Sequence, residues 1–230
     1  MSFKPNFDLL REWKDAEKIS DLAGSSPCIA VFKYGKKTLV YVCDRHCANR
    51  SFDMVDFCFS QDFGITPDVL LTEIENEDYN HKFSWHGVQD NTLAYAVMVA
   101  AKKSIPVVFA DLSDEQMVKV IHTKFAEEAD LKRVFNAGGP NSDGNLYQQM
   151  SAYLDMAGRD RFMLENIATA LNKYDTVFAI FGVGHYESQR LVLEDMLGKP
   201  EYITRTKNMR GDFSNIKISP IKLCDFKLKK

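Results

Sequence analysis

The sequence predicts an α/β fold, with a mostly parallel central sheet, helices on both faces and a short antiparallel hairpin portion. Three observations lead to this prediction. Apolar runs alternate along the chain with stretches of helical periodicity, which is the order found in βαβ proteins. The later apolar runs are continuous, as in strands that are buried on both faces. The first two runs are separated by a short turn, which is typical of a hairpin.

The N-terminal part of the chain predicts one helix followed by the hairpin. Within residues 1–25 we expect an amphipathic helix over Phe7–Leu22, because apolar side chains recur there near helical spacing. Two apolar runs follow, at Cys28–Phe32 and Thr38–Cys43. Gly35 lies between them and supplies the residue that a tight turn favours, so these two runs form the expected hairpin.

The rest of the chain alternates between helices and buried strands. Three segments are predicted to be helical: Asn91–Lys103, which is Ala-rich, Ser113–Glu128, which opens with a capping serine and two carboxylates, and the long segment Tyr147–Tyr174. Continuous apolar runs predict three buried strands, at Val69–Leu71, Ile105–Ala110 and Thr176–Val183. The Gly- and Asn-rich loop 136–146 is a candidate lid, and residues 199–230 are expected to add edge strands. Because no segment flanking that loop is large enough to fold alone, we expect residues 1–230 to form a single domain.

Composition limits the classes of function. A formal net charge of −3 shows no Lys/Arg surplus, which argues against a nucleic-acid partner. No apolar run approaches the roughly 18 residues that a membrane span needs, and the charged N-terminal stretch does not resemble a secretory signal. We therefore expect a cytoplasmic protein that acts on a small-molecule or peptide substrate. The 5 cysteines form no CxxC pair, so reduced thiols in the core are expected.

Reactive side chains follow several predicted strands at their carboxyl ends, where open parallel sheets bind ligands. The strands run into the segments Asp44-Arg45-His46, Thr72-Glu73-Ile74-Glu75, Asp111 and Gly182-Val183-Gly184-His185. Because the carboxyl ends of parallel strands meet at one edge of a sheet, we expect His46, Glu73 and His185 to lie together. An imidazole beside a carboxylate can act as a general base or as a metal ligand near neutral pH.

The long helix predicted over Tyr147–Tyr174 carries a second group of polar residues. Arg159 and Asn166 lie seven residues apart, at the edge of an apolar stripe that includes Met163 and Ile167. Beside a buried stripe both side chains need partners, and a carboxylate of the site or an anionic substrate group would supply them. The alternative is that arginines of this helix pair with its own acidic residues at the surface, as Arg159–Asp160 or Arg161–Glu165.

The chain contains no GxSxG, GxxxxGK[ST], HExxH or EF-hand motif, and its GxGxxG is only partial. What it does contain, in order, is a strand ending in Cys43-Asp-Arg-His46, a strand ending in a glutamate, an Arg-Asp-Arg-Phe-Met-x-Glu-Asn helix and a strand ending in Gly-x-Gly-His. In this order the chain resembles the superfamily that joins erythromycin esterases, ChaN-type haem-binding proteins and TraB/Tiki proteins. The resemblance covers about residues 38–197. It is most specific at Arg159, Asp160, Met163, Glu165, Asn166, Gly182, Gly184 and His185.

The resemblance implies an α/β core with His46, Glu73 and His185 clustered at the sheet edge. Many relatives have glycine in place of Cys43. Known activities in the superfamily differ, and they include lactone ester hydrolysis, metal-dependent peptidase activity, haem binding and control of peptide pheromones. Similarity of fold therefore does not select the substrate.

Three classes of function remain open, the third being a degenerate relative that serves as a partner-binding scaffold. In the first, the protein is a hydrolase in which His46 deprotonates a water, Glu73 orients His46, and His185 or Arg159 stabilises the oxyanion. A metal-dependent version has His46, Glu73 and His185 hold Zn²⁺, Mn²⁺ or Fe²⁺. The expected substrate-binding residues are Arg45, Glu75, Asp160, Asn166 and Gly184. In the second class, a non-catalytic protein binds haem or another small molecule in the same cleft.

Overall fold

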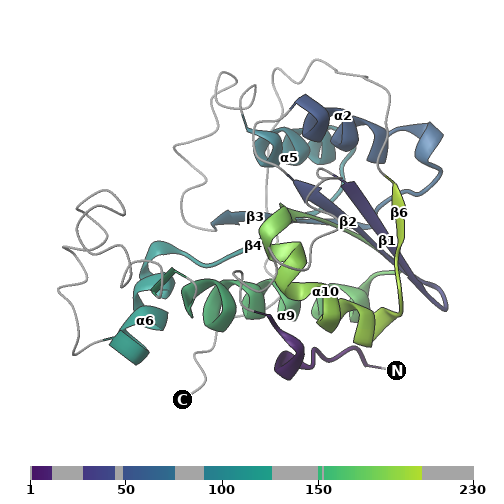
Figure 1. The fold of residues 1–230 in the computed structure, drawn as a ribbon. Coiled ribbons are helices and arrows are strands. Elements are labelled where there is room, and N and C mark those ends of the chain that lie inside the picture. Colours follow the sequence, from purple (N-terminus) through teal and green to yellow (C-terminus); the bar gives the residue numbers. More distant parts are fainter. Residues whose placement is uncertain are drawn as a thin grey trace.

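A computed structural model describes residues 2–11, 28–44, 49–75, 91–125, 150–151 and 153–203, without the side chains of residues 49, 50 and 75. These ranges contain a six-stranded sheet with the strand order β4-β3-β5-β2-β1-β6 (Figure 1). The strands are β1 (Cys28–Tyr34), β2 (Lys37–Asp44), β3 (Val69–Glu75), β4 (Val107–Asp111), β5 (Thr176–Gly182) and β6 (Glu201–Ile203). Strands β4, β3, β5 and β2 are parallel, whereas β1 is antiparallel to both β2 and β6. The predicted α/β fold is confirmed.

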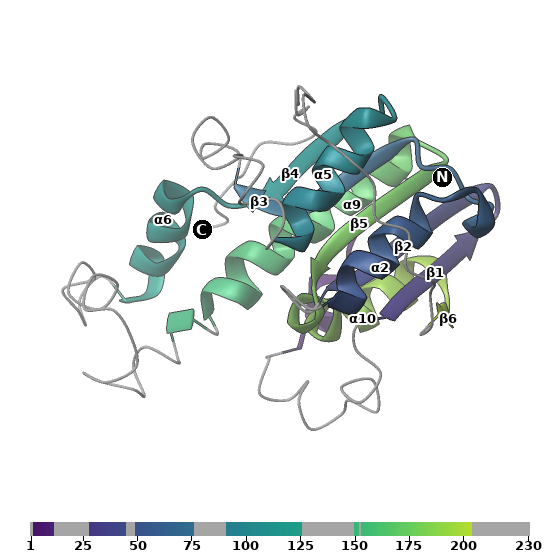
Figure 2. The same cartoon turned by 90° about the horizontal axis from the view of Figure 1, so that it is seen from above.

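Helices pack on both faces of this sheet, as Figures 1 and 2 show. The longer helices are α2 (Asn49–Cys58), α5 (Thr92–Lys102), α6 (Asp114–Phe125), α9 (Asp160–Lys173) and α10 (Val183–Leu197). The short ones are the 3-10 turns η1 (Phe7–Leu9) and η2 (Gln61–Phe63) and a π-helical turn, η3 (Asp155–Arg159). Helices α2 and α5 cover one face, and α9 and α10 cover the other. None of the described helices combines the length and the apolar character that crossing a bilayer requires.

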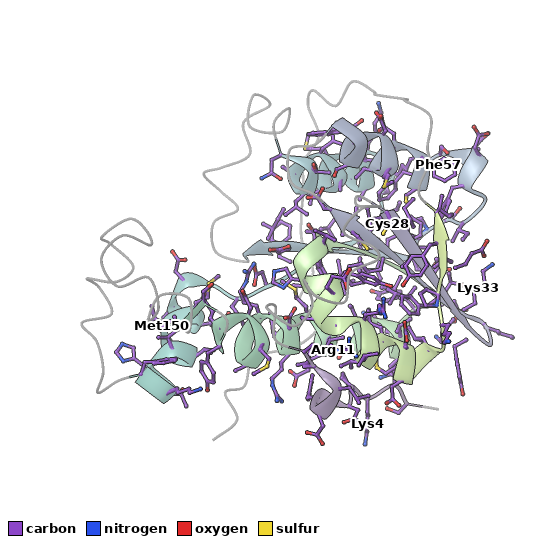
Figure 3. All side chains as sticks on the ribbon, in the orientation of Figure 1. Lys4, Arg11, Cys28, Lys33, Phe57 and Met150 are labelled. Carbon is purple, nitrogen blue, oxygen red and sulfur yellow. The ribbon has the colours of Figure 1, made fainter. Side chains whose placement is uncertain are left out.

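Alternate side chains of each strand enter two separate apolar cores. On β2, Leu39 and Tyr41 pack toward α9 and α10, whereas Val40 and Val42 pack toward α2 and α5. Both layers are filled by side chains, with Cys28 among those on the sheet (Figure 3). A large apolar side chain that is fully buried contributes about 1.5–3 kcal/mol. Burial on both faces explains why the strands are continuous apolar runs rather than alternating ones.

Local sequence accounts for the turns and helix starts that frame the sheet. Gly35 has a φ of +60°, the left-handed value that a two-residue hairpin turn requires at its first position. The side chain of Asn91 caps α5 by accepting hydrogen bonds from the backbone N–H groups of Leu93 and Ala94. At the start of α6, Ser113 and Gln116 each bond the backbone N–H of the other, as in a capping box.

The predicted N-terminal α-helix is wrong where the structure describes it. Residues Phe7–Leu9 form a single 3-10 turn, and Leu10 leaves it with an extended backbone (φ −62°, ψ 139°). The apolar residues of this turn pack against the core beneath α9 and α10, and the Arg11 N–H donates to the Ser188 carbonyl. Residues 7–11 therefore pack along α10 and do not continue as a helix of their own. Residues 12–27 lie outside the described ranges.

Most of the other predicted elements agree with the observed ones where the structure describes them, but the π-helical turn η3 interrupts the long helix predicted over Tyr147–Tyr174 before α9 begins. Strand β3 extends beyond its predicted end at Leu71 to Glu75, and β6 provides a short edge strand at the start of the predicted tail. The loop 136–146 and residues 204–230 lie outside the described ranges. Among the described cysteines, Cys28, Cys43 and Cys58 are free and buried, as expected for core thiols.

Candidate functional site

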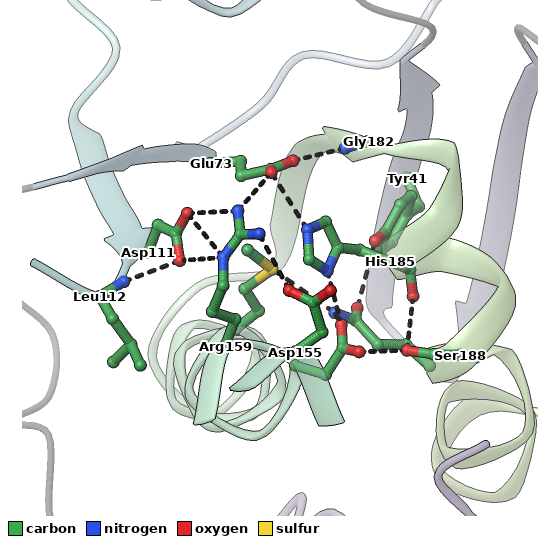
Figure 4. Close-up of polar contacts among 12 residues, drawn as sticks. Tyr41, Glu73, Asp111, Leu112, Asp155, Arg159, Gly182, His185 and Ser188 are labelled. Atoms are coloured by element: carbon green, nitrogen blue, oxygen red, sulfur yellow. Dashed lines mark hydrogen bonds and ion pairs between the residues drawn. The ribbon is translucent and has the colours of Figure 1, made fainter. Parts of the chain in front are cut away.

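A charged cluster lies where the carboxyl ends of β3, β4 and β5 meet α9 and α10 (Figure 4). Two cations and four carboxylates contact one another there. We define the charged cluster as Glu73, Asp111, Asp155, Arg159, Asp160 and His185. This edge of an open parallel sheet is where such folds bind ligands.

Two local irregularities bring these side chains together. The β3–β4 register shifts between Thr72 and Glu75, so that β3 has a bulge within the stretch that contains Glu73. Such a bulge re-aims a side chain, and Glu73 reaches the N-terminus of α10. The π-helical turn η3 precedes α9 and places Arg159 beside Asp155 one turn earlier.

Arg159 is the central cation of the cluster. Its Nε and Nη2 atoms donate to the two oxygens of Asp111 at 3.0 and 2.7 Å, which is a bidentate arrangement. Its Nη1 donates to Asp155 at 3.0 Å, and Nη2 also donates to Glu73 at 2.6 Å. Although burial alone lowers the pKa of Arg159, the carboxylates around it, Asp111 above all, hold that pKa above its usual value. Arg159 therefore joins three carboxylates from β3, β4 and η3.

His185 is held between two carboxylates. Its Nδ1 lies 2.8 Å from Asp160 Oδ1, and its Nε2 lies 3.1 Å from Glu73 Oε1. Burial alone lowers the pKa of His185, but the negative charges of Glu73 and Asp160 outweigh it and raise the pKa well above its ordinary value. The ring is therefore an imidazolium at neutral pH and donates a hydrogen bond from each nitrogen.

Glu73 connects the two cations. Its Oε1 accepts hydrogen bonds from both Arg159 and His185, and its Oε2 accepts one from the Gly182 N–H at 2.7 Å. Burial opposes ionisation, yet the combined effect of His185, Arg159 and Gly182 holds the pKa of Glu73 well below its usual range. Glu73 is thus a carboxylate, fixed in place by three donors.

The cluster has a surface side and a buried side. The side chains of Arg159, Asp155 and Glu73 are 20%, 12% and 9% exposed. The side chains of His185 and Asp160 lie behind them at 4% and 1%. Burial raises the pKa of Asp155, and Arg159 offsets that effect only in part. A substrate arriving from solvent would meet Arg159, Asp155 and Glu73 first.

The structure brings four of the predicted site residues together: Glu73, Arg159, Asp160 and His185. Gly184 lies beside them in the first turn of α10. Arg159 does not form the alternative surface pair with Asp160, since its carboxylate partners are Asp111, Asp155 and Glu73.

Other predicted site residues are not placed in the cluster. Asn166 is buried two turns along α9, where its side-chain amide donates to the Phe162 carbonyl at 2.9 Å. Glu75 ends β3, but its side chain lies outside the described part of the chain. Arg45 and His46 also lie outside it. The strand that leads to them ends at Asp44, opposite Gly182 in the sheet register and therefore at the same edge.

Several residues of this site are not predicted by the sequence patterns. The sequence pattern identifies Asp111 only as a residue that follows a predicted strand, and it does not identify Asp155 as a candidate. The spacing of Asp155 four residues before Arg159 is a signal that could have found it. Ser188 and Gln189, three and four residues after His185 on α10, carry the same kind of signal, because such positions share a helix face.

The described residues do not fit a divalent metal ion at Glu73 and His185. Both ring nitrogens of His185 already face carboxylates, and the Glu73 oxygen nearest to the ring also accepts from Arg159. An ion in that position would have to displace the guanidinium. Within the described ranges, no group of three or more His, Cys, Asp or Glu side chains could hold a metal ion.

The two aromatic residues that flank Gly182–His185 in the sequence are in the core. Phe181 and Tyr186 are fully buried, and both rings pack against Tyr41. Neither offers a free face to haem. No protein-family model, curated protein or solved structure matches this chain, so functional inference depends on the geometry of the charged cluster.

Proposed function

We propose that this protein is a hydrolase that activates water at the charged cluster, without a metal ion, on an ester or peptide-like substrate. The observation that carries the proposal is the fixed row of charges from Asp160 through His185 and Glu73 to Arg159 at the carboxyl edge of the sheet. Acyl transfer to water needs a base near the nucleophile and a cation near the developing oxyanion. A carboxylate flanked by two cations, partly open to solvent, supports that chemistry.

The exposures and charges suggest a role for each residue. Arg159 is the more exposed of the two cations, which favours it over His185 as the group that stabilises the oxyanion. The raised pKa of His185 makes it a poor base, so in this proposal His185 keeps Glu73 ionised and in place. Glu73 orients the base or the attacking water through its carboxylate. The base is His46, which follows a strand at the same edge.

Hydrolysis of two substrate classes tests the proposal. Purified protein would be assayed with nitrophenyl esters of graded acyl length and with fluorogenic dipeptide amides, with and without a chelator. Glu73→Gln keeps the shape of the side chain but removes its charge, and it should lower kcat/KM by about 100-fold or more. Glu115→Gln is the matched control, because Glu115 is exposed on α6 and pairs only with Lys119 among the described residues. The chelator should have no effect.

Two outcomes would contradict the hydrolase. One is full activity of both Glu73→Gln and His185→Gln on a substrate that the wild-type protein cleaves. The other is no turnover of either substrate class together with a cofactor absorption band in the purified protein, which would favour haem binding.

The proposal also includes membership of the esterase–ChaN–TraB superfamily, a cytoplasmic location, and the absence of nucleic-acid and membrane partners. Cell fractionation with a tagged chain checks the location. Lack of retention on heparin and on anionic vesicles checks the excluded partners, because both surfaces capture proteins through clustered positive charge.

A further inference from the structure

Behind His185 the structure contains a buried set of polar side chains around Asp160, and three of them, Ser188, Gln189 and Tyr41, have no role in the proposed mechanism. Three donors converge on the Asp160 carboxylate. His185 and Gln189 both bond Oδ1, at 2.8 and 2.7 Å, and the Ser188 hydroxyl donates to Oδ2 (Figure 4). The Gln189 side-chain oxygen in turn accepts from the Tyr41 hydroxyl at 3.1 Å. Every member of this set is almost completely shielded from solvent.

The direction of each hydrogen bond in this set follows from its neighbours. Burial raises the pKa of Tyr41 well above its ordinary value, so its hydroxyl stays protonated and donates to Gln189. Because the Gln189 oxygen is taken by that donor, its nitrogen faces Asp160. The carboxylate only accepts. The set therefore has a single consistent pattern that ends at the Nδ1–H of His185.

The placement of these residues on α10 links them to the ring. His185, Ser188 and Gln189 occupy positions i, i+3 and i+4, so they form one helix face, and that face contacts Asp160 of α9. Without Ser188 and Gln189, His185 would be the only described side-chain partner of the Asp160 carboxylate. The carboxylate could then rotate about its Cβ–Cγ bond. The ring would then lose the fixed partner that orients its other nitrogen toward Glu73.

We infer that Ser188, Gln189 and Tyr41 are positioning residues of the site, which hold Asp160 so that His185 keeps Nδ1 toward Asp160 and Nε2 toward Glu73. The importance of this arrangement for turnover rests on the proposed hydrolase function. The arrangement itself is a property of the unliganded protein, and it is measured without a substrate.

The experiment follows the ring of His185 by NMR in protein labelled at histidine carbon. The chain has 5 histidines, and His185→Gln assigns the signal. The variants Ser188→Ala, Gln189→Met and Tyr41→Phe each remove a polar group with little change in volume. Each is made alone and together with Asp160→Asn.

The expected results form a graded series. Asp160→Asn should lower the titration midpoint of His185 by at least about one pH unit, because one of the two carboxylates on the ring becomes neutral. Ser188→Ala and Gln189→Met should each shift the titration midpoint of His185 by about 0.3–1 pH unit. Tyr41→Phe should shift it by less, because the Tyr41 hydroxyl is one hydrogen bond further from Asp160. In the Asp160→Asn background the three substitutions should cause no further shift, since they act through that carboxylate.

Tyr95→Phe is the matched control. Tyr95 is another buried tyrosine whose hydroxyl donates to a carboxylate, Asp56, but it lies on the α2–α5 side of the sheet. Its loss should lower stability and leave the His185 midpoint unchanged. The inference is overturned if the three substitutions leave the midpoint at the wild-type value, or if their shifts persist undiminished beside Asp160→Asn. Shifts as expected in a protein that cleaves neither substrate class would uphold the positioning role and refute the hydrolase.

Discussion

Replacing Arg159 with methionine removes a cation that contacts Glu73, Asp111 and Asp155 together. Methionine fills much of the space of the arginine stem, so the main loss is the guanidinium and its hydrogen bonds. The side chains of the three carboxylates are only 9%, 5% and 12% exposed, and water therefore compensates poorly for the lost partner. The substitution should destabilise the fold as well as the site.

The size of the effect follows from burial. Removing one partner of a buried ion pair costs about 3–5 kcal/mol, and the partial exposure of Arg159 places the expected loss near the lower end, about 3 kcal/mol. For a chain of 230 residues each kcal/mol lowers the melting temperature by about 2–4 °C, so a fall of about 6–12 °C is expected. A surface ion pair contributes about 0–1 kcal/mol. The measured loss in the free energy of unfolding therefore distinguishes a buried ion pair from a surface one.

The loss should also depend on pH. Because the pKa of Glu73 lies below its unfolded value of 4.5, the stabilisation from this carboxylate is present above pH 4.5 and disappears as the pH falls through the folded pKa. Without Arg159 the carboxylates repel one another, and protonating them relieves that repulsion. The difference between wild type and Arg159→Met should be largest near pH 8 and shrink toward pH 4.

Urea unfolding at several pH values, followed by circular dichroism, measures the difference. The control is Arg190→Met, which removes an arginine that contacts Glu194 on the same helix at 3.4 Å. It should cost less than about 1 kcal/mol. If Arg159→Met costs no more than Arg190→Met at pH 8, the charged cluster does not stabilise the fold and this reasoning is refuted.

Three further substitutions test other parts of the structure. His185→Gln should remove a stabilisation that is complete below pH 6.5 and that wild type loses as the pH rises through the raised pKa of His185, so urea midpoints should converge at alkaline pH. Gly158→Ala should destabilise by about 1–3 kcal/mol in thermal melts, against the usual helix preference for alanine, because the new Cβ would lie 3.0 Å from Val120. Asn172→Ala should cost about 1–2 kcal/mol and expose the N-terminal segment to proteolysis, because Asn172 bonds both the N–H and the carbonyl of Phe3; unchanged cleavage would contradict this.

Much of the fold could be predicted from sequence because burial imposes a simple pattern. Strands such as β2 and β5 are buried on both faces, and that requirement makes them continuous apolar runs. The prediction of an N-terminal helix was wrong for a related reason. Its apolar residues have helical spacing, but Phe7, Leu9 and Leu10 are used to pack against the core beneath α9 and α10.

The candidate site could be predicted only in part. Glu73 and His185 follow apolar runs, and this position in the sequence is enough to place them at the carboxyl edge of the sheet. The spacing of Asp155 from Arg159 and of Gln189 from His185 indicates a shared helix face, but it does not tell a buried partner from an exposed one. Their role depends on the π-helical turn and on the approach of α10 to α9, which tertiary packing decides.

By itself the sequence determined the α/β architecture and the edge of the sheet at which Glu73, Arg159 and His185 gather. Only the tertiary structure decided the partners and the charge states of those groups. His185 is an imidazolium because Glu73, 112 residues away in sequence, and Asp160 on another helix approach its two nitrogens in a buried setting. Proton affinity depends on distance and on dielectric surroundings, and for groups so far apart along the chain both are properties of the folded molecule.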